Sequence, residues 1–199
     1  NNLIRVIKDF SISKYNYLYK SKIELPKKQR KLLVVGQVED DASLILGTNS
    51  MTNLIFLKKV KKENPDAFII YKPHPDVTAG NRLGKIKKKD IKSYSDVVME
   101  DVNITELISS VDEIHTMTSF VGFEGLVQRK TVVTYGTPFY SGWGLTIDKI
   151  KCKRRKRILT LEELVAAALI LYPRYIDPST ENYCTPDVLV KYIYGLQCK

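Results

Sequence analysis

LLVVGQVEDD, residues 32–41 of the chain, is a short apolar run that stops abruptly in polar residues. The stretch AFIIYKPHPD at residues 67–76 repeats this pattern about one strand–helix–strand unit later. Such runs are typical of buried parallel strands that deliver side chains to the carboxyl edge of a sheet. Ligands bind at that edge in open α/β folds. The sequence therefore predicts an edge that carries a carboxylate cluster and a histidine between two prolines.

A regular alternation of strands and helices extends outward from these two stretches. Alternation of this kind predicts parallel pairing with right-handed crossovers, and hence an α/β fold with helices on both faces of the sheet. We expect strands at residues 31–36, 66–72, 95–99, 111–115 and 131–135, and helices at about 51–64, 103–110 and 119–129.

Three segments are expected along the chain. Residues 1–25 read as a helical or linker segment, and residues 26–150 as the α/β domain. Residues 151–199 read as C-terminal helices that pack on or beyond this domain. One of these helices begins at Thr160, where Thr-Leu-Glu-Glu fits a capping box, and the last spans about 186–196.

Composition excludes some classes of protein. No apolar run reaches the roughly 18 residues that a membrane span needs, and the N-terminus does not read as a signal peptide. The start without Met indicates either a fragment of a longer protein or processing. The three cysteines match no zinc or redox spacing and indicate reduced thiols in the cytoplasm.

The net charge of +10 is concentrated in four basic runs. Such runs attract nucleic acid, an anionic leaflet or an anionic polymer, or they are simply solvated surface. Because the runs contain few aromatic residues, they do not favour nucleic acid. The runs occupy residues 27–31, 58–62, 85–92 and 151–157.

His74 is the first candidate for chemistry. Its neighbours Pro73 and Pro75 restrict the backbone, so the imidazole is aimed. Lys72 stands two residues before it, on the same face if the strand continues. A histidine and a lysine at a strand end can neutralise a phosphate leaving group, whereas the alternative is a structural histidine.

The acidic run after the first strand is the second candidate. If the chain stays extended, Glu39 and Asp41 share one face with Gln37. A carboxylate there can act as the nucleophile at the anomeric carbon of a sugar. The alternative is a solvated turn with a helix cap at Asp40 or Asp41.

Hydroxyl groups follow the fourth expected strand. Thr118 and Ser119 come just before a helix, whose free N–H groups would make an anion site. Glu124, about one turn into this helix, is placed to accept hydrogen bonds from ribose hydroxyls. Ordinary capping by Thr118 or Ser119 is the alternative.

Two further places can contact a substrate. Tyr140 and Trp143, in a glycine-rich loop, can pack on a sugar or base ring, or they can close the core. Arg82 can clamp a carboxylate, or it can belong to a surface turn.

Together these residues resemble a known family, the capsular-polysaccharide β-Kdo transferases of the KpsC type, whose relatives include the LipA capsule proteins. The resemblance spans about residues 31 to 185 and rests on several long and unusual motifs. The matching stretches are residues 36–41 (GQVEDD), 64–66 (NPD), 71–76 (YKPHPD), 79–82 (AGNR), 112–116 (DEIHT), 118–124 (TSFVGFE), 135–146 (YGTPFYSGWGLT) and 172–178 (YPRYIDP).

The resemblance implies a retaining transfer of 3-deoxy-D-manno-octulosonic acid (Kdo) from CMP-β-Kdo, which builds the poly-Kdo linker of a lipid-anchored capsular polysaccharide. It implies one Rossmann-like half of a GT-B transferase, here the CMP-Kdo-binding half. The family's Q-x-x-x-D motif falls on Gln37 and Asp41, which makes Asp41 the expected nucleophile. Its HP motif falls on His74 and Pro75 and implies a role on the CMP phosphate. No metal or other cofactor is expected.

The resemblance also implies partners that this chain does not contain. The acceptor is a Kdo-terminated lysophospholipid, bound by an N-terminal acceptor domain that is missing from the chain. A cytoplasmic protein, peripheral on the anionic face of the inner membrane, is expected. Three alternatives remain. The first is another GT-B transferase that uses CMP-sialic acid or a UDP-sugar, and the second is a non-catalytic basic module that binds an anionic polymer or nucleic acid. The third is an inactive domain that only recruits capsule machinery.

Overall fold

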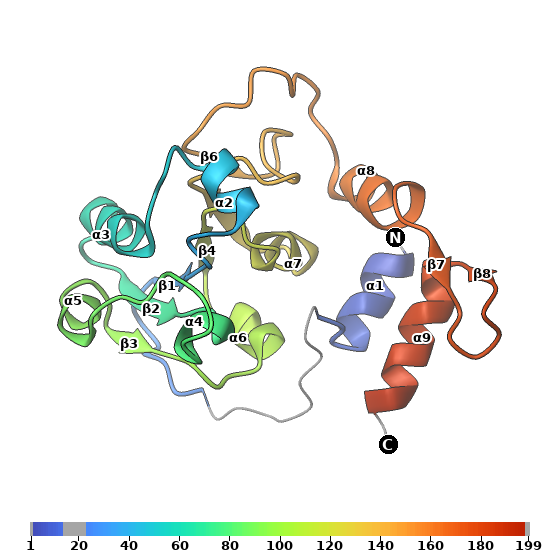
Figure 1. The fold of residues 1–199 in the computed structure, drawn as a ribbon, viewed down its shortest axis with the longest axis horizontal. Helices are drawn as coiled ribbons and strands as arrows, with labels where there is room; N and C mark the ends of the chain where they lie inside the picture. The colour runs from blue at the N-terminus through green and yellow to red at the C-terminus, as the bar shows by residue number, and fades with distance from the viewer. Residues whose placement is uncertain (1, 14–22, 198–199) are drawn as a thin grey trace.

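The computed structural model describes residues 2–13 and 23–197 (Figure 1). Its centre is a parallel six-stranded sheet with the strand order β3-β2-β1-β4-β5-β6. The α/β fold expected from the sequence is therefore confirmed. The strands are β1 (Lys31–Val35), β2 (Phe68–Lys72), β3 (Val97–Val98), β4 (Glu113–Thr116), β5 (Thr131–Thr134) and β6 (Ile147–Asp148).

Helices cover both faces of the sheet. Side chains alternate along β1, so Leu32 and Val34 enter one cluster of the core while Leu33 and Val35 enter the other. The first cluster is covered by α2 (Ala42–Gly47), α3 (Asn53–Glu63) and α5 (Lys88–Tyr94). The second is covered by α6 (Ile104–Ser110), α7 (Val121–Val127) and α8 (Leu161–Ala166).

The two ends of the chain meet beside the sheet. Helix α1 (Asn2–Asp9) lies next to α9 (Pro186–Gln197) (Figure 1), and the rings of Phe10 and Tyr194 stack with centroids 4.1 Å apart. Leu3 and Ile4 join the same buried cluster as α6 and α7, so α1 shares the core of the domain. Of the predicted segment 1–25, residues 14–22 lie outside the described part of the chain.

Capping explains where several helices begin. Asn103 accepts from the backbone N–H groups of Thr105 and Glu106 at the start of α6. Thr160 and Glu163 form the predicted capping box of α8, which continues into a π-helical turn, η1 (Ala167–Leu171). These starts were predicted because capping residues are visible in the sequence.

Several short elements were missed. Helices α2, α4 (Pro75–Thr78) and α5 were not predicted, nor were strand β6 and the hairpin of β7 (Tyr175–Ile176) and β8 (Tyr183–Cys184). These missed elements have two to seven residues, so each holds little hydrophobic periodicity. The glycine-rich loop that contains Tyr140 and Trp143 ends in the edge strand β6.

The strand order fixes where a ligand can bind. The chain moves from β1 to β2 and β3 on one side, and then returns to place β4 on the other side of β1. The loops after β1 and β4 therefore diverge, and a crevice opens between them at the carboxyl edge. No helix within residues 2–13 and 23–197 is both long and apolar enough to cross a bilayer.

Candidate active site

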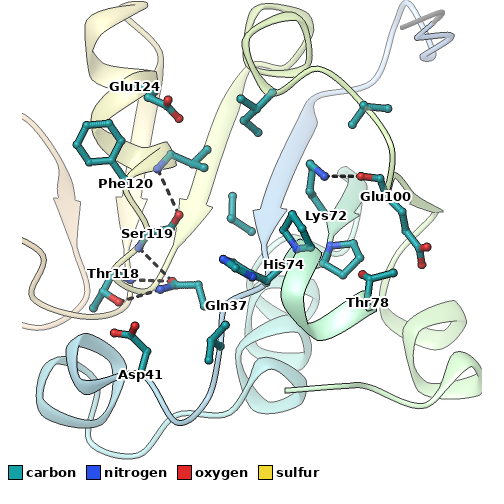
Figure 2. Close-up of a pocket in the computed structure, with 18 of the residues that line it drawn as sticks. Gln37, Asp41, Lys72, His74, Thr78, Glu100, Thr118, Ser119, Phe120 and Glu124 are labelled. Atoms are coloured by element: carbon teal, nitrogen blue, oxygen red, sulfur yellow. Dashed lines mark hydrogen bonds between the residues drawn. The ribbon is translucent and has the colours of Figure 1, made fainter. Parts of the chain in front are cut away.

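A cavity of about 440 Å³ lies at this carboxyl edge (Figure 2). Asp41 from the loop after β1 and His74 from the loop after β2 both line it, as the sequence analysis required. Its size falls within the range of small-molecule sites. Other predicted residues in its lining are Gln37, Lys72, Pro75, Thr118, Ser119 and Glu124.

Gln37 joins the two halves of the crevice. Its Oε1 accepts from the backbone N–H groups of Met117, Thr118 and Ser119, at 3.2, 2.8 and 3.1 Å. Its Nε2 donates to Thr118 Oγ1 at 2.8 Å. The side chain is only 7% exposed, so these bonds hold the loop after β4 against the end of β1.

This arrangement corrects one prediction. The sequence suggested that free N–H groups before α7 would bind an anion, but the amide oxygen of Gln37 already occupies three of them. The N–H of Val121 in turn donates to Ser119 Oγ at 3.2 Å. A ligand here therefore meets the hydroxyls of Thr118 and Ser119 rather than this row of backbone donors.

Asp41 begins helix α2. Its Oδ1 accepts from the backbone N–H of Ser43 at 2.8 Å and from Ser43 Oγ at 2.6 Å. The residue is the N-cap of α2 and also lines the cavity, so the capping interpretation and the functional one describe the same side chain.

Glu39 does not share the face of Asp41, because the chain turns at residues 39–40 instead of staying extended. Its Oε1 accepts from the backbone N–H of Asn53 at 2.7 Å, at the start of α3. Glu39 does not line the cavity, so the predicted substrate contact is not part of this site.

His74 caps helix α4. Its Nδ1 accepts from the backbone N–H of Asp76 at 3.2 Å. In a neutral imidazole the proton then resides on Nε2, which makes Nε2 a hydrogen-bond donor. Figure 2 shows the ring between Gln37 and Lys72, at the centre of the cavity wall.

Lys72 is a buried cation in the same wall. Its Nζ donates to the carbonyl oxygen of Glu100 at 2.6 Å (Figure 2). Burial lowers the pKa of the ammonium group, while the charges of Asp101 and Glu100 act in the opposite direction. Lys72 thus brings positive charge and fixes the segment after β3 at the cavity.

Three predicted contacts lie elsewhere. Arg82 pairs with Asp40 of the same chain, with Nη2 3.2 Å from Oδ1, and so clamps an internal carboxylate. Tyr140 is fully buried, and its hydroxyl donates to the carbonyl oxygen of Ser119 behind the cavity. Trp143 donates to the carbonyl of Phe139. None of the three lines the cavity.

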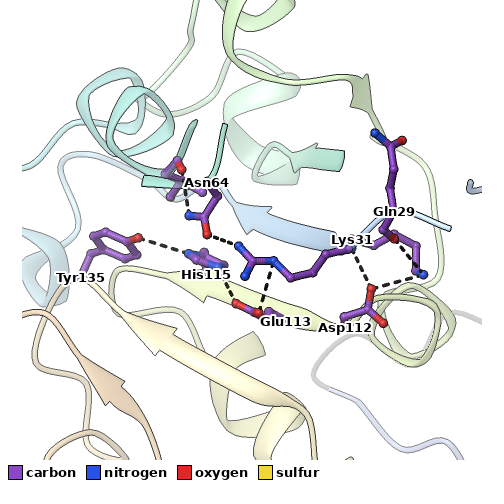
Figure 3. A network of polar contacts seen from close by, with 9 residues as sticks. Gln29, Lys31, Asn64, Asp112, Glu113, His115 and Tyr135 are labelled. Atoms are coloured by element: carbon purple, nitrogen blue, oxygen red, sulfur yellow. Dashed lines mark hydrogen bonds and ion pairs between the residues drawn. The ribbon is translucent and has the colours of Figure 1, made fainter. Parts of the chain in front are cut away.

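The second histidine, His115, belongs to a separate network (Figure 3). It is 2% exposed, with Nδ1 3.2 Å from the hydroxyl of Tyr135 and Nε2 3.3 Å from Glu113 Oε2. The hydrogen bond with His115 lowers the pKa of Glu113 against the opposing effect of burial. This histidine holds β4 and the loop after β5 together and does not reach the cavity.

Sequence reasoning missed several lining residues. Ser43 sits inside the unpredicted helix α2, and Glu100 and Asp101 follow β3 without a recognisable motif. The apolar part of the wall comes from Val102, Ile104, Phe120 and Val121. Only the positions of these apolar residues in the sequence could have indicated a place in the cavity wall, since each follows a predicted strand or begins a predicted helix.

The cavity thus combines a carboxylate, an imidazole, an ammonium group and hydroxyls with an apolar wall. A carboxylate can attack or stabilise an electron-poor carbon, and the donors can neutralise a departing anion. An apolar wall suits the face of a base or sugar ring. This set of groups fits group transfer from a nucleotide-linked donor.

Comparisons with known proteins agree with this chemistry. A family described as capsule polysaccharide biosynthesis protein matches residues 4–175. The capsule polysaccharide modification protein LipA of Neisseria meningitidis serogroup A is 47% identical over 182 residues, which cover 90% of this chain and 26% of LipA. The lipopolysaccharide-processing protein LpsZ of Rhizobium meliloti is 45% identical over 173 residues, covering 85% of this chain and 39% of LpsZ.

Solved structures extend the comparison. The beta Kdo 2,7 transferase of Thermosulfurimonas dismutans KpsC superposes with a TM-score of 0.84 at 35% identity, covering 98% of this chain and 60% of that chain. Its beta Kdo 2,4 transferase gives a TM-score of 0.85 at 35% identity, with 98% and 61% covered. The chain therefore spans about a quarter to two fifths of the curated relatives and three fifths of the solved transferase chains.

Proposed function

The chain belongs to the capsule polysaccharide biosynthesis protein family, and we propose that it is the donor-binding half of a retaining β-Kdo transferase that uses CMP-β-Kdo. Its fold is one Rossmann-like half of a GT-B transferase. The observation that carries the proposal is the single cavity lined by both Asp41 and His74.

In the proposed reaction, a carboxylate oxygen of Asp41 attacks the anomeric carbon of Kdo while the bond to the CMP phosphate breaks. Negative charge develops on the phosphate, and His74 Nε2, Lys72 and the hydroxyl of Ser119 are the donors in the same wall. An acceptor hydroxyl then displaces Asp41 from the sugar. Two displacements at one carbon retain its configuration.

The nucleoside has a matching place in the proposed site. Glu124 lies on the first turn of α7 and lines the cavity beside the apolar side chains of Phe120 and Val121. The carboxylate suits hydrogen bonds from ribose hydroxyls, and the apolar wall suits the base. Because the chain spans only about three fifths of the solved transferase chains, we expect these residues by themselves to bind the donor weakly and to turn over poorly.

Calorimetric titration of the chain with CMP and with UMP tests the donor class. We expect CMP to bind more tightly than UMP. We also expect His74→Ala to lower the affinity for CMP about tenfold, because one hydrogen-bond donor to the phosphate is lost. His115→Ala is not a usable control, since His115 holds the core together. Arg82→Ala removes an exposed cation outside the cavity and should leave CMP affinity within about twofold.

Tighter binding of UMP than of CMP would instead favour a UDP-sugar donor, and no binding of either nucleotide would contradict the proposed site. Binding of CMP that His74→Ala leaves unchanged would remove His74 from the phosphate site. CMP-sialic acid, the remaining rival donor, is separated from CMP-Kdo by comparing covalent adducts formed with each.

We also propose that the acceptor is a Kdo-terminated lysophospholipid and that the chain docks on an anionic membrane surface from the cytoplasm. The supporting observation is the pairing of α3 and α5, adjacent helices on one side of the molecule (Figure 1). Both helices carry exposed lysines, and among the described residues no ion pair joins these lysines to a carboxylate. The exposed lysines are Lys58, Lys59, Lys62, Lys88, Lys89 and Lys92.

Sedimentation with vesicles tests this docking. We expect binding to vesicles that contain phosphatidylglycerol and none to pure phosphatidylcholine, with about 1 kcal/mol contributed per lysine near the surface. Replacing Lys88, Lys89 and Lys92 by glutamate should abolish it. The matched control reverses Lys151, Lys153 and Arg154, which are exposed outside this face. Equal sedimentation with both lipids, or equal loss in both variants, would contradict the proposal.

A further inference from the structure

We propose that Ser43 is a positioning residue for Asp41, whose hydroxyl fixes one carboxylate oxygen and stabilises the carboxylate when it leaves the sugar. This inference rests on the proposed function, in which Asp41 is the nucleophile. Neither the sequence motifs nor the comparisons assign a role to Ser43. The starting observation is that Ser43 Oγ lies 2.6 Å from Asp41 Oδ1, the shortest of the bonds described around this side chain.

The direction of the hydrogen bonds around Ser43 can be worked out from Gln37. Because Gln37 Oε1 accepts from three backbone N–H groups, the other end of the amide is its NH₂ group. This NH₂ group donates to Thr118 Oγ1 at 2.8 Å. Thr118 Oγ1 lies 3.3 Å from Ser43 Oγ, and its own proton can therefore donate to Ser43.

Ser43 has one hydroxyl proton, and the short contact assigns it to Asp41. The result is a chain of three hydrogen bonds, from Gln37 to Thr118 to Ser43 to Asp41, in which every donor points toward the carboxylate. Hydrogen bonds aligned in this way polarise one another. Asp41 and Thr118 lie next to each other at the lower left of Figure 2.

Helix capping alone does not explain the hydroxyl bond. Asp41 Oδ1 already caps the N-terminus of α2 by accepting from the backbone N–H of Ser43. The same local pair occurs at Asp177 and Ser179, where N and Oγ lie 2.8 and 2.6 Å from Oδ1. What distinguishes Ser43 is its contact with Thr118 and its position in the cavity wall, and Ser179 has neither.

The role follows from the proposed chemistry. In the first step an Asp41 oxygen forms a bond to the anomeric carbon, the bond from that carbon to the phosphate oxygen breaks, and CMP leaves with the electron pair. In the second step the oxygen of an acceptor hydroxyl or of water bonds to the carbon, and the ester bond to Asp41 breaks. The electron pair returns to the carboxylate, and the hydroxyl proton passes to solvent.

As the ester breaks, negative charge spreads over both carboxylate oxygens. A hydroxyl that donates to Oδ1 stabilises this charge, so Ser43 makes Asp41 a better leaving group. Loss of a hydrogen bond to a charged group in this step corresponds to a decrease in rate of about tenfold to a hundredfold. We therefore expect Ser43→Ala to slow breakdown of the adduct by this factor. Formation should not slow, because the same hydrogen bond also stabilises the free carboxylate before it attacks.

The experiment follows the Asp41 adduct on the chain by intact-mass spectrometry after mixing with CMP-Kdo and, for breakdown, after removal of the donor. Ser43→Thr keeps the hydroxyl and should restore breakdown to within about threefold of the wild-type rate. Ser179→Ala removes the equivalent bond outside the cavity and should behave as the wild type. Thermal unfolding shows that each variant folds.

Three results would overturn the inference. Breakdown at the wild-type rate in Ser43→Ala would leave Asp41 as nucleophile but remove the role of Ser43. Equal slowing in Ser43→Ala and Ser43→Thr would show that the hydroxyl is not responsible. No adduct on the wild-type chain, at donor concentrations that saturate it, would contradict the proposed function itself, and the inference with it.

Discussion

Replacing Asp41 by asparagine should abolish the covalent adduct and reduce release of CMP from CMP-Kdo by a factor on the order of 10³ to 10⁶, the range typical of removing a nucleophile. An amide does not displace the phosphate, so the first step is lost. Asparagine caps a helix as well as aspartate does, so α2 should persist. Mass spectrometry of the adduct and an assay of CMP release measure the two effects.

The neighbouring carboxylate provides a matched control. Asp40 carries the same charge but pairs with Arg82 and does not line the cavity. We expect Asp40→Asn to keep adduct formation within about threefold of the wild type, because an exposed ion pair contributes little. An adduct that survives in Asp41→Asn, or that disappears in Asp40→Asn, would assign the nucleophile to another residue.

The meeting of Asp41 and His74 at one cavity was predictable from the sequence. Each follows a buried apolar run, and parallel strands bring their carboxyl ends to one edge whatever the loops do. The caps of α6 and α8 were predictable for a similar reason, since the capping side chain and the N–H groups it binds are neighbours in sequence.

Directions of side chains in the loops were not predictable. Glu39 was placed beside Asp41 on the assumption of an extended chain, but a turn at residues 39–40 sends it to the start of α3. Arg82 found its carboxylate in Asp40, 42 residues away. These outcomes depend on tertiary contacts, which local pattern does not encode.

The aromatic loop shows the same limit. Tyr140 and Trp143 were open to two interpretations, a wall for a sugar ring or closure of the core. The fold puts the ring of Tyr140 against Phe123 and Phe139 and buries it completely. Burial also raises the pKa of its hydroxyl, which makes proton transfer by this group unfavourable. Its role is to support Ser119 from behind.

Gln37→Leu should lower the free energy of unfolding by about 3–5 kcal/mol, the second large effect that we expect. Leucine fills similar space but accepts no hydrogen bond. The N–H groups of Met117 and Thr118 would then lose their acceptor inside the crevice, and Ser119 N–H would keep only Thr116 Oγ1, at 3.1 Å. Each buried donor left without an acceptor costs about 1–3 kcal/mol. Denaturation by urea, followed by circular dichroism, measures the change.

Gln37→Glu separates the two functions of the side chain, because a carboxylate still accepts from the three N–H groups but no longer donates to Thr118. We expect it to lose less than about half the stability lost by Gln37→Leu. If Gln37 also directs the hydrogen bonds that reach Asp41, Gln37→Glu should slow breakdown of the adduct although the fold persists.

A free energy of unfolding of Gln37→Leu within about 1 kcal/mol of the wild-type value would contradict this role of Gln37. It would mean that water replaces the amide oxygen, and that the loop after β4 is held by other contacts.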